Sequence, residues 1–190
     1  MHESLKDILR CPNCSGILSM SNVEYTNERI ISGRLTCNSC HQSFEIINGI
    51  PRFMPEEMYS SSFGFQWKTF YDVQIDVLNN TRESEETFLQ KTRLTPQDVQ
   101  GRILLDAGVG AGRFADVVSR WGCKKVVGVD LSEAVEAAFK NVGDRDNVDI
   151  LQADILNLPF EKESFDIIYS IGVLHHTPDT KKHLCNSSLF

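Results

Sequence analysis

The feature that most constrains the fold is a glycine-rich loop between an apolar run and a helical pattern, in the stretch LLDAGVGAGRF. The apolar run 103–106 is typical of a buried strand, and residues 112–121 carry apolar side chains along one side of a helix. Glycines let the backbone turn tightly and let a ligand contact it directly. A tight strand-to-helix turn without a ligand explains the loop equally well, so the loop alone leaves both interpretations open. The three glycines are Gly108, Gly110 and Gly112.

Further apolar runs alternate with helical patterns after this loop. The sequence predicts strands at residues 126–129, 148–152 and 165–172, with a helix at 132–141 between the first two. Strands separated by helices predict a parallel, doubly wound sheet, so the expected fold class is α/β.

An acid follows each of the first three predicted strands. Asp106 precedes the glycine loop, Asp130 lies 22 residues after Gly108, and Asp154 follows the third strand. A carboxylate at the second position can accept both hydroxyls of an adenosine ribose. We expect the third acid to meet an adenine amino group, because the carboxyl ends of parallel strands share one edge of the sheet.

The glycine spacing separates two classes of nucleoside ligand. A dinucleotide site has the pattern G-x-G-x-x-G, which would place its last glycine at position 113, where this chain has Arg113. An acid in the turn would also repel a pyrophosphate. S-adenosylmethionine has no phosphate and carries a sulfonium and an α-amino group, so Asp106 suits it better.

These residues resemble a known family. LLDAGVGAGRF, VVGVDLS, QADILNLPF and FDIIYSIGVLHH are similar to the successive motifs of class I S-adenosylmethionine-dependent methyltransferases, most of all the methyltransferase type 11 group. The resemblance covers about residues 101–178 and implies a partial Rossmann-like sheet with about four of the family's seven strands, in the order 3-2-1-4. The implied donor-binding residues are Asp106, Gly108, Gly110 and Gly112 around the methionine moiety, Asp130 with Leu131 at the ribose, Asp154 and Ile155 at the adenine, and Ile171 in the pocket wall.

The resemblance also implies a direct methyl transfer, in which the enzyme mainly positions donor and acceptor. An acceptor that must lose a proton would need a base. His175 and His176 follow the fourth predicted strand and are candidates for that base or for substrate contacts. The alternative is that one packs and the other is solvated, so the catalytic residues stay unassigned.

Two Cys-x-x-Cys pairs precede this region, separated by 22 residues. Two such pairs supply a tetrahedral four-sulfur site, which suits a structural zinc ion, because four thiolates leave no coordination position for catalysis. A redox role is the alternative. CPNCSGIL, CNSC and FEIINGIPRFMP resemble the zinc ribbons of the tRNA-methyltransferase-activator type. The predicted zinc ligands are Cys11, Cys14, Cys37 and Cys40.

Three segments are therefore expected: a zinc ribbon at residues 1–54, a helical linker or lid at 55–100, and an S-adenosylmethionine-binding methyltransferase domain at 101–190. The aromatic residues Phe65, Gln66 and Trp67 with their neighbours resemble a donor-covering lid, with core packing as the alternative. Because only about four strands are supplied, we expect the last segment to be incomplete at its C-terminus. Turnover by this chain is then in doubt, and a non-catalytic donor-binding or zinc-ribbon interaction module is the alternative function.

The composition limits which classes of binding partner and which location we expect for this chain. The 190-residue chain has a net charge of −7 and no run of Lys and Arg, which disfavours nucleic acid as a partner. No stretch approaches the roughly 18 apolar residues of a membrane span, and no signal peptide is visible, so we expect a cytoplasmic location and no membrane partner. The methyl acceptor cannot be named from the sequence. A nucleotide-dependent oxidoreductase is disfavoured by the glycine spacing.

Overall fold

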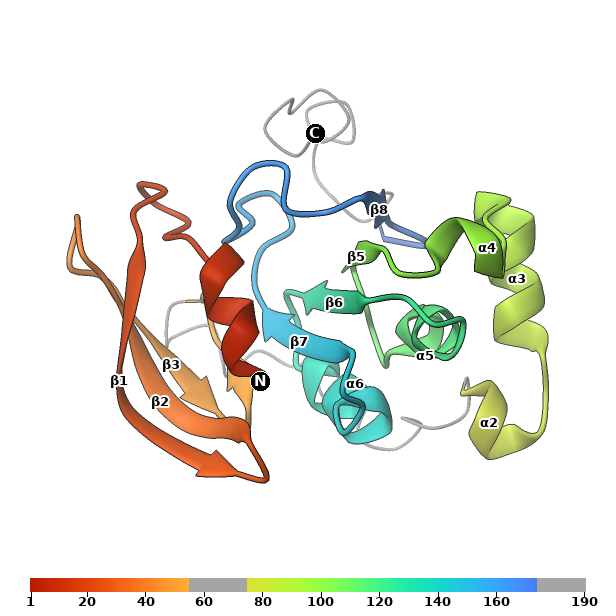
Figure 1. Ribbon diagram of the computed structural model, residues 1–190, viewed down its shortest axis with the longest axis horizontal. Coiled ribbons are helices and arrows are strands. Elements are labelled where there is room, and N and C mark those ends of the chain that lie inside the picture. Colours follow the sequence, from red (N-terminus) through yellow and green to blue (C-terminus); the bar gives the residue numbers. More distant parts are fainter. Residues whose placement is uncertain (55–74, 174–190) are drawn as a thin grey trace.

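The computed structural model describes residues 1–54 and 75–173, which contain two four-stranded sheets (Figure 1). Residues 1–54, called the ribbon below, begin with a 3₁₀ helix and continue as an antiparallel sheet in the order β1-β2-β3-β4. Its elements are η1 (Glu3–Ile8), β1 (Leu18–Thr26), β2 (Arg29–Cys37), β3 (Ser43–Ile47) and β4 (Ile50–Pro51).

The second sheet is parallel throughout, with the order β7-β6-β5-β8. Its elements are β5 (Ile103–Ala107), α5 (Arg113–Arg120), β6 (Lys125–Asp130), α6 (Ala134–Val142), β7 (Val148–Gln152) and β8 (Ile167–Tyr169). This arrangement confirms the α/β class and the predicted strand order. The last strand is shorter than predicted, because only three of its residues pair with β5.

Between residues 75 and 102, the structure contains three short helices ahead of β5: α2 (Asp76–Asn79), α3 (Glu83–Thr92) and α4 (Pro96–Val99). The Asp76 carboxylate accepts hydrogen bonds from the Ser84 and Glu85 amides, both 2.9 Å long, at the start of α3. The Phe88 ring of α3 lies 5.5 Å from the Trp121 ring and 5.1 Å from the Tyr169 ring, centroid to centroid. These contacts hold α3 over α5 and the end of β8.

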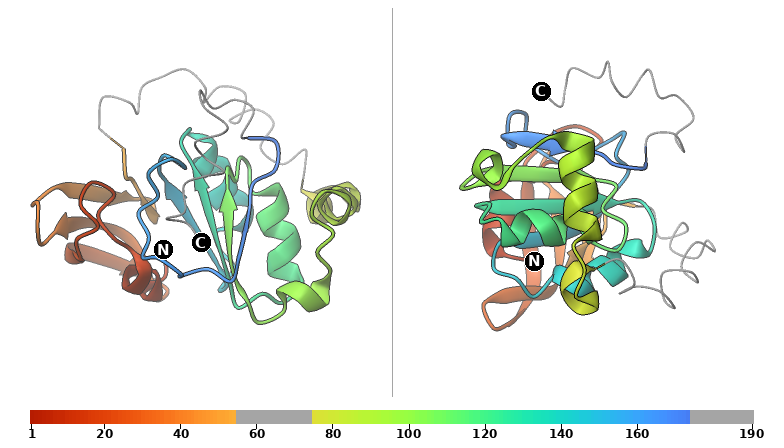
Figure 2. Two further views of the ribbon diagram at one scale, coloured as in Figure 1. Left: turned by 90° about the horizontal axis from the view of Figure 1, so that it is seen from above. Right: turned by 90° about the vertical axis from the view of Figure 1, so that its right-hand side faces the viewer.

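Different elements pack against the two faces of the parallel sheet. Alternate side chains of β5, β6 and β7 enter two separate apolar clusters, as strand geometry requires. One cluster contains side chains of α3, α5 and α6 together with Ile50 of β4; the other contains the remaining buried side chains of the ribbon. Figure 2 shows the ribbon on one side of the sheet and α5 with α3 on the other. The cluster shared with the ribbon contains the sheet residues Leu105, Ala107, Val127, Val129 and Leu151, and Ala153 just after β7.

A buried acid joins the ribbon to the sheet. The side chain of Asp149, in β7, is 0% exposed and accepts a 2.8 Å bond from Lys125 Nζ and a 2.7 Å bond from the His2 amide. Burial opposes its negative charge, but the bonds from His2 and Lys125 outweigh burial and hold the pKa of Asp149 below its ordinary value.

Of the helices in the described ranges, none is both long and apolar enough to cross a bilayer. The predicted lid residues Phe65, Gln66 and Trp67 and the histidines His175 and His176 lie outside the described residues.

Replacing Asp149 with alanine should destabilise the fold by about 3 kcal/mol, because it leaves buried donors without their acceptor. Urea unfolding monitored by circular dichroism measures this change. The matched control is Glu45→Ala, which removes an exposed ion pair with Arg34 and should cost less than about 1 kcal/mol. Equal losses in the two variants would contradict a structural role for the buried acid.

Candidate functional site

The glycine loop leaves β5 at the carboxyl edge of the sheet and enters α5 through left-handed backbone. Gly108, Gly110 and Gly112 have φ angles of +97°, +53° and +89°. Side chains are strained in that region, which accounts for the three glycines. The amides of Gly108 and Val109 both donate to the Val129 carbonyl, at 2.7 and 2.9 Å. The loop is thereby fixed against the end of β6.

The segment that follows β8 also lies very close to Gly108. A Cβ atom built on Gly108 would lie 2.2 Å from a methyl carbon of Val173, whereas one on Gly101, which also has positive φ, would meet nothing within 4 Å. Alanine at Gly108 would therefore suffer both backbone strain and a steric clash, whereas alanine at Gly101 would suffer backbone strain alone.

Gly108→Ala should displace the loop and weaken donor binding strongly, whereas Gly101→Ala should cost only the backbone strain of about 1 kcal/mol. Thermal unfolding and donor titration of both variants measure these effects. Similar behaviour of the two variants would show that the close contact with Val173 is unimportant.

Asp130 holds the glycine loop with its own carboxylate. Its Oδ2 accepts a 3.0 Å bond from the Gly110 amide, and its Oδ1 accepts bonds from the Ser132 amide and hydroxyl at 2.9 and 2.7 Å. A carboxylate offers about four acceptor positions, so room for a further donor remains. Leu131, beside it, is 44% exposed. Sequence reasoning did not identify Ser132 as a partner of this acid.

Asp106 lies deeper than the other two acids, at 1% exposure. Burial raises its pKa to about 7; the nearby Tyr169 hydroxyl favours the charged form, and the Asp130 charge opposes it. Tyr169 is the register partner of Asp106 across β5 and β8, yet the two side chains miss hydrogen-bond geometry. Among the described residues, three buried polar atoms at this edge have no hydrogen-bond partner: Asp106 Oδ2, Tyr169 Oη and Ser170 Oγ.

Such a cluster is unusual, because buried polar atoms normally have partners. Its position at the carboxyl ends of β5 and β8 is where ligands of open α/β sheets bind. Tyr169 and Ser170 were not identified from the sequence. The register of the two strands links them to Asp106, and one sequence alone does not fix that register.

The segment after β7 carries Asp154 and Ile155. Asp154 Oδ1 accepts a 2.9 Å bond from the Leu156 amide, which leaves its other oxygen available to a ligand. Ile155 packs into the cluster shared with the ribbon, whereas Ile171 packs into the cluster on the helix side. These two predicted pocket residues thus lie on opposite faces of the sheet.

The four cysteines of the ribbon converge on one point. Their Sγ atoms all lie within 4.8 Å of one another, with 3.6 Å between Cys11 and Cys40 and 3.4 Å between Cys14 and Cys37. Tetrahedral zinc with Zn–S bonds of about 2.3 Å separates its sulfurs by about 3.8 Å, so the cluster fits a zinc ion. The ligand atoms come from a turn before β1 and from the end of β2 with the turn after it.

Cys37→Ser should abolish stoichiometric metal binding, because three thiolates bind zinc more weakly than four and the ribbon's fold depends on the site. Metal content by elemental analysis, after gel filtration, measures this. The matched control is Cys123→Ser, since Cys123 is a buried free thiol outside the cluster. A Cys37→Ser protein that keeps one zinc per chain would contradict the assignment.

The region that contains the parallel sheet is similar to known methyltransferases. Residues 105–188 match the family model described as a methyltransferase domain. The chain is 33% identical over 90 residues to a tRNA U34 carboxymethyltransferase of Marinobacter nauticus, covering 46% of this chain and 27% of that protein. It is 32% identical over 88 residues to a ubiquinone biosynthesis O-methyltransferase of Neisseria meningitidis, covering 43% of this chain and 36% of that protein.

A solved S-adenosylmethionine-dependent methyltransferase from Mesorhizobium loti is 31% identical, with a TM-score of 0.44, covering 50% of this chain and 42% of that one. The matches to the two curated relatives thus span about a quarter to a third of those proteins' length.

Proposed function

We propose that this chain binds S-adenosylmethionine and transfers its methyl group to an acceptor, because residues 105–188 match the family model described as a methyltransferase domain. The observation that carries the proposal is the buried Asp106 carboxylate at the start of the glycine loop, whose Oδ2 has no hydrogen-bond partner among the described residues. A buried acid without a cation is costly, and a ligand that carries an α-ammonium and a sulfonium supplies the missing charge.

The proposed donor contacts follow the three acids. Asp106 binds the methionine end, with Tyr169 and Ser170 beside it, and the loop glycines allow close approach of the donor. Asp130 accepts ribose hydroxyls through its free acceptor position, and Asp154 accepts from the adenine amino group. Leu131, Ile155 and Ile171 are proposed as apolar wall residues.

The four cysteines are proposed to hold a structural zinc ion. Zinc bound by four thiolates keeps no open coordination position, so it supplies folding free energy and takes no part in methyl transfer.

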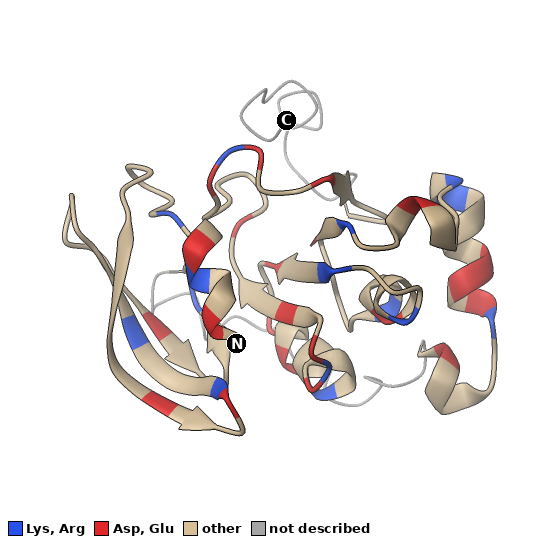
Figure 3. Ribbon diagram, in the orientation of Figure 1, with Lys and Arg blue, Asp and Glu red and all other residues tan. Residues whose placement is uncertain are grey.

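The methyl acceptor is not assigned. Figure 3 shows Lys and Arg positions interspersed with Asp and Glu positions along the ribbon and the sheet region, with no long run of basic positions in the part of the chain that is described. A nucleic-acid acceptor therefore has no evident electrostatic support there.

Isothermal titration with S-adenosylmethionine tests the proposal, with NAD as the control ligand. We expect micromolar binding of the sulfonium donor and none of NAD. Because Asp130→Ala removes the ribose acceptor, it should weaken donor binding by about 1–3 kcal/mol.

Ser132→Ala is the matched control for Asp130→Ala. It removes one donor to the Asp130 carboxylate but keeps the acid, so its affinity should stay close to that of the unmodified chain. An equal loss in both variants would contradict a specific role of the Asp130 carboxylate as the ribose acceptor. A folded, metal-loaded chain that binds no donor would contradict the proposed function.

A further inference from the structure

Arg52 ties the ribbon to the end of β7. Its side chain is 5% exposed, and its Nη1 donates a 2.8 Å bond to the side-chain oxygen of Gln152. Its Nη2 pairs with the carboxylate of Glu136 in α6. The next ribbon residue, Phe53, donates its amide to the Gln152 carbonyl at 2.8 Å. The ribbon thus adds a short parallel bridge beside the last residue of β7.

Gln152 in turn contacts the segment that carries Asp130. Its side-chain nitrogen donates a 3.0 Å bond to the carbonyl of Leu131, the residue after Asp130. Gln152 is itself 3% exposed and lies two residues before Asp154. Arg52 therefore holds the side-chain amide of Gln152. That amide in turn lies next to the segments of Asp130 and Asp154, the acids proposed to bind ribose and adenine.

A second tie lies on the far side of Asp154. The Arg10 amide donates to the Pro159 carbonyl at 2.9 Å, and the Glu161 amide donates to the Ile8 carbonyl at 2.8 Å. The Arg10 guanidinium also pairs with Glu161 at 2.7 Å. Residues 153–158 thus run between two points that are hydrogen-bonded to the ribbon.

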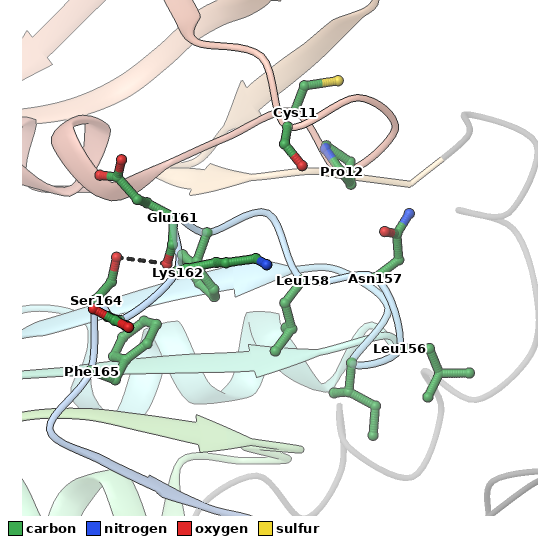
Figure 4. A pocket seen from close by; sticks show the side chains of 13 residues that line it. Cys11, Pro12, Leu156, Asn157, Leu158, Glu161, Lys162, Ser164 and Phe165 are labelled. Carbon is green, nitrogen blue, oxygen red and sulfur yellow. Dashed lines mark hydrogen bonds between the residues drawn. The ribbon is translucent and has the colours of Figure 1, made fainter. Parts of the chain in front are cut away.

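The span between these ties lies over a cavity of about 180 Å³ (Figure 4). Cys11 and Pro12 line it from the ribbon, and Ile155, Leu158 and Phe165 line it from the span and the segment that follows. Ala153, Ile155 and Leu158 pack against the cluster shared with the ribbon. Because close packing is what normally fixes a side chain, the cavity beside them reduces that packing and increases the part that the two ties play in holding the span. Loss of either tie should therefore let the span move.

We propose that the ribbon is a positioning element of the donor site and that Arg52 is its principal positioning residue. Arg52 acts through Gln152 on the segments of Asp130 and Asp154. Its planar fork binds Gln152 and Glu136 together, which a lysine ammonium does not reproduce in the same geometry. This inference rests on the proposed function for its donor, but the positioning itself can be measured without a donor.

The first measurement is the affinity for S-adenosylmethionine of the full, zinc-loaded chain and of Arg52→Ala, Gln152→Ala and the double variant. We expect each single change to weaken binding about tenfold, within the range of couplings through packed networks. Because both residues act in one relay, the double variant should bind no more weakly than the single ones. Arg34→Ala removes an exposed ribbon ion pair away from this relay and should bind normally.

The second measurement is amide hydrogen exchange in residues 153–158 without donor. Arg52→Ala should speed exchange there about tenfold, since their hydrogen bonds open more often, while exchange in β5 stays unchanged. Zinc content and thermal unfolding confirm that each variant is folded.

Outcomes of the two measurements are distinguishable. Unchanged exchange and unchanged affinity in Arg52→Ala and Gln152→Ala would overturn the positioning role, as would losses that add in the double variant. A chain that binds no donor but shows the faster exchange contradicts the proposed function and supports the positioning role.

Discussion

The apolar core that the ribbon shares with one face of the parallel sheet is the contact on which the rest of the structure depends. A parallel sheet is stable only when both faces are covered, usually by helices. Here α5 and α6 cover one face and the ribbon covers the other, so Leu105, Val127 and Leu151 are buried against an antiparallel sheet. The ribbon is therefore a structural layer of the parallel-sheet region.

This arrangement also explains how a small ribbon is stabilised. About fifty residues bury too little surface for a large core of their own, and a metal site is one common remedy. In this chain two zinc-ligand candidates, Cys11 and Cys37, belong to the same cluster as the sheet side chains. Folding of the ribbon and cover of the sheet are thus coupled, and Asp149 reinforces the contact with buried hydrogen bonds.

Much of the fold could be predicted from local patterns. The apolar runs with intervening helices indicate the parallel sheet, and the positive φ angles at Gly108, Gly110 and Gly112 match the demand that the glycine loop makes. The two cysteine pairs are local patterns as well, because each pair lies in a short turn. Together they indicate the four-sulfur cluster. Features that depend on distant segments were not predictable. The pairing of Asp106 with Tyr169 needs the register of β5 and β8, and the cover of the sheet by the ribbon needs the full tertiary arrangement.

We propose that the buried Asp106 carboxylate binds the cationic groups of the methyl donor. Its pKa is raised to about 7 by burial, so part of the population carries a proton near neutral pH. A bound cation favours the carboxylate and lowers that pKa, so binding should release a proton. Calorimetric titration with S-adenosylmethionine near pH 7, in two buffers of different ionisation enthalpy, counts the protons. The account predicts a release by the unmodified chain that Asp106→Asn lacks; the same proton change and affinity in both proteins would contradict it.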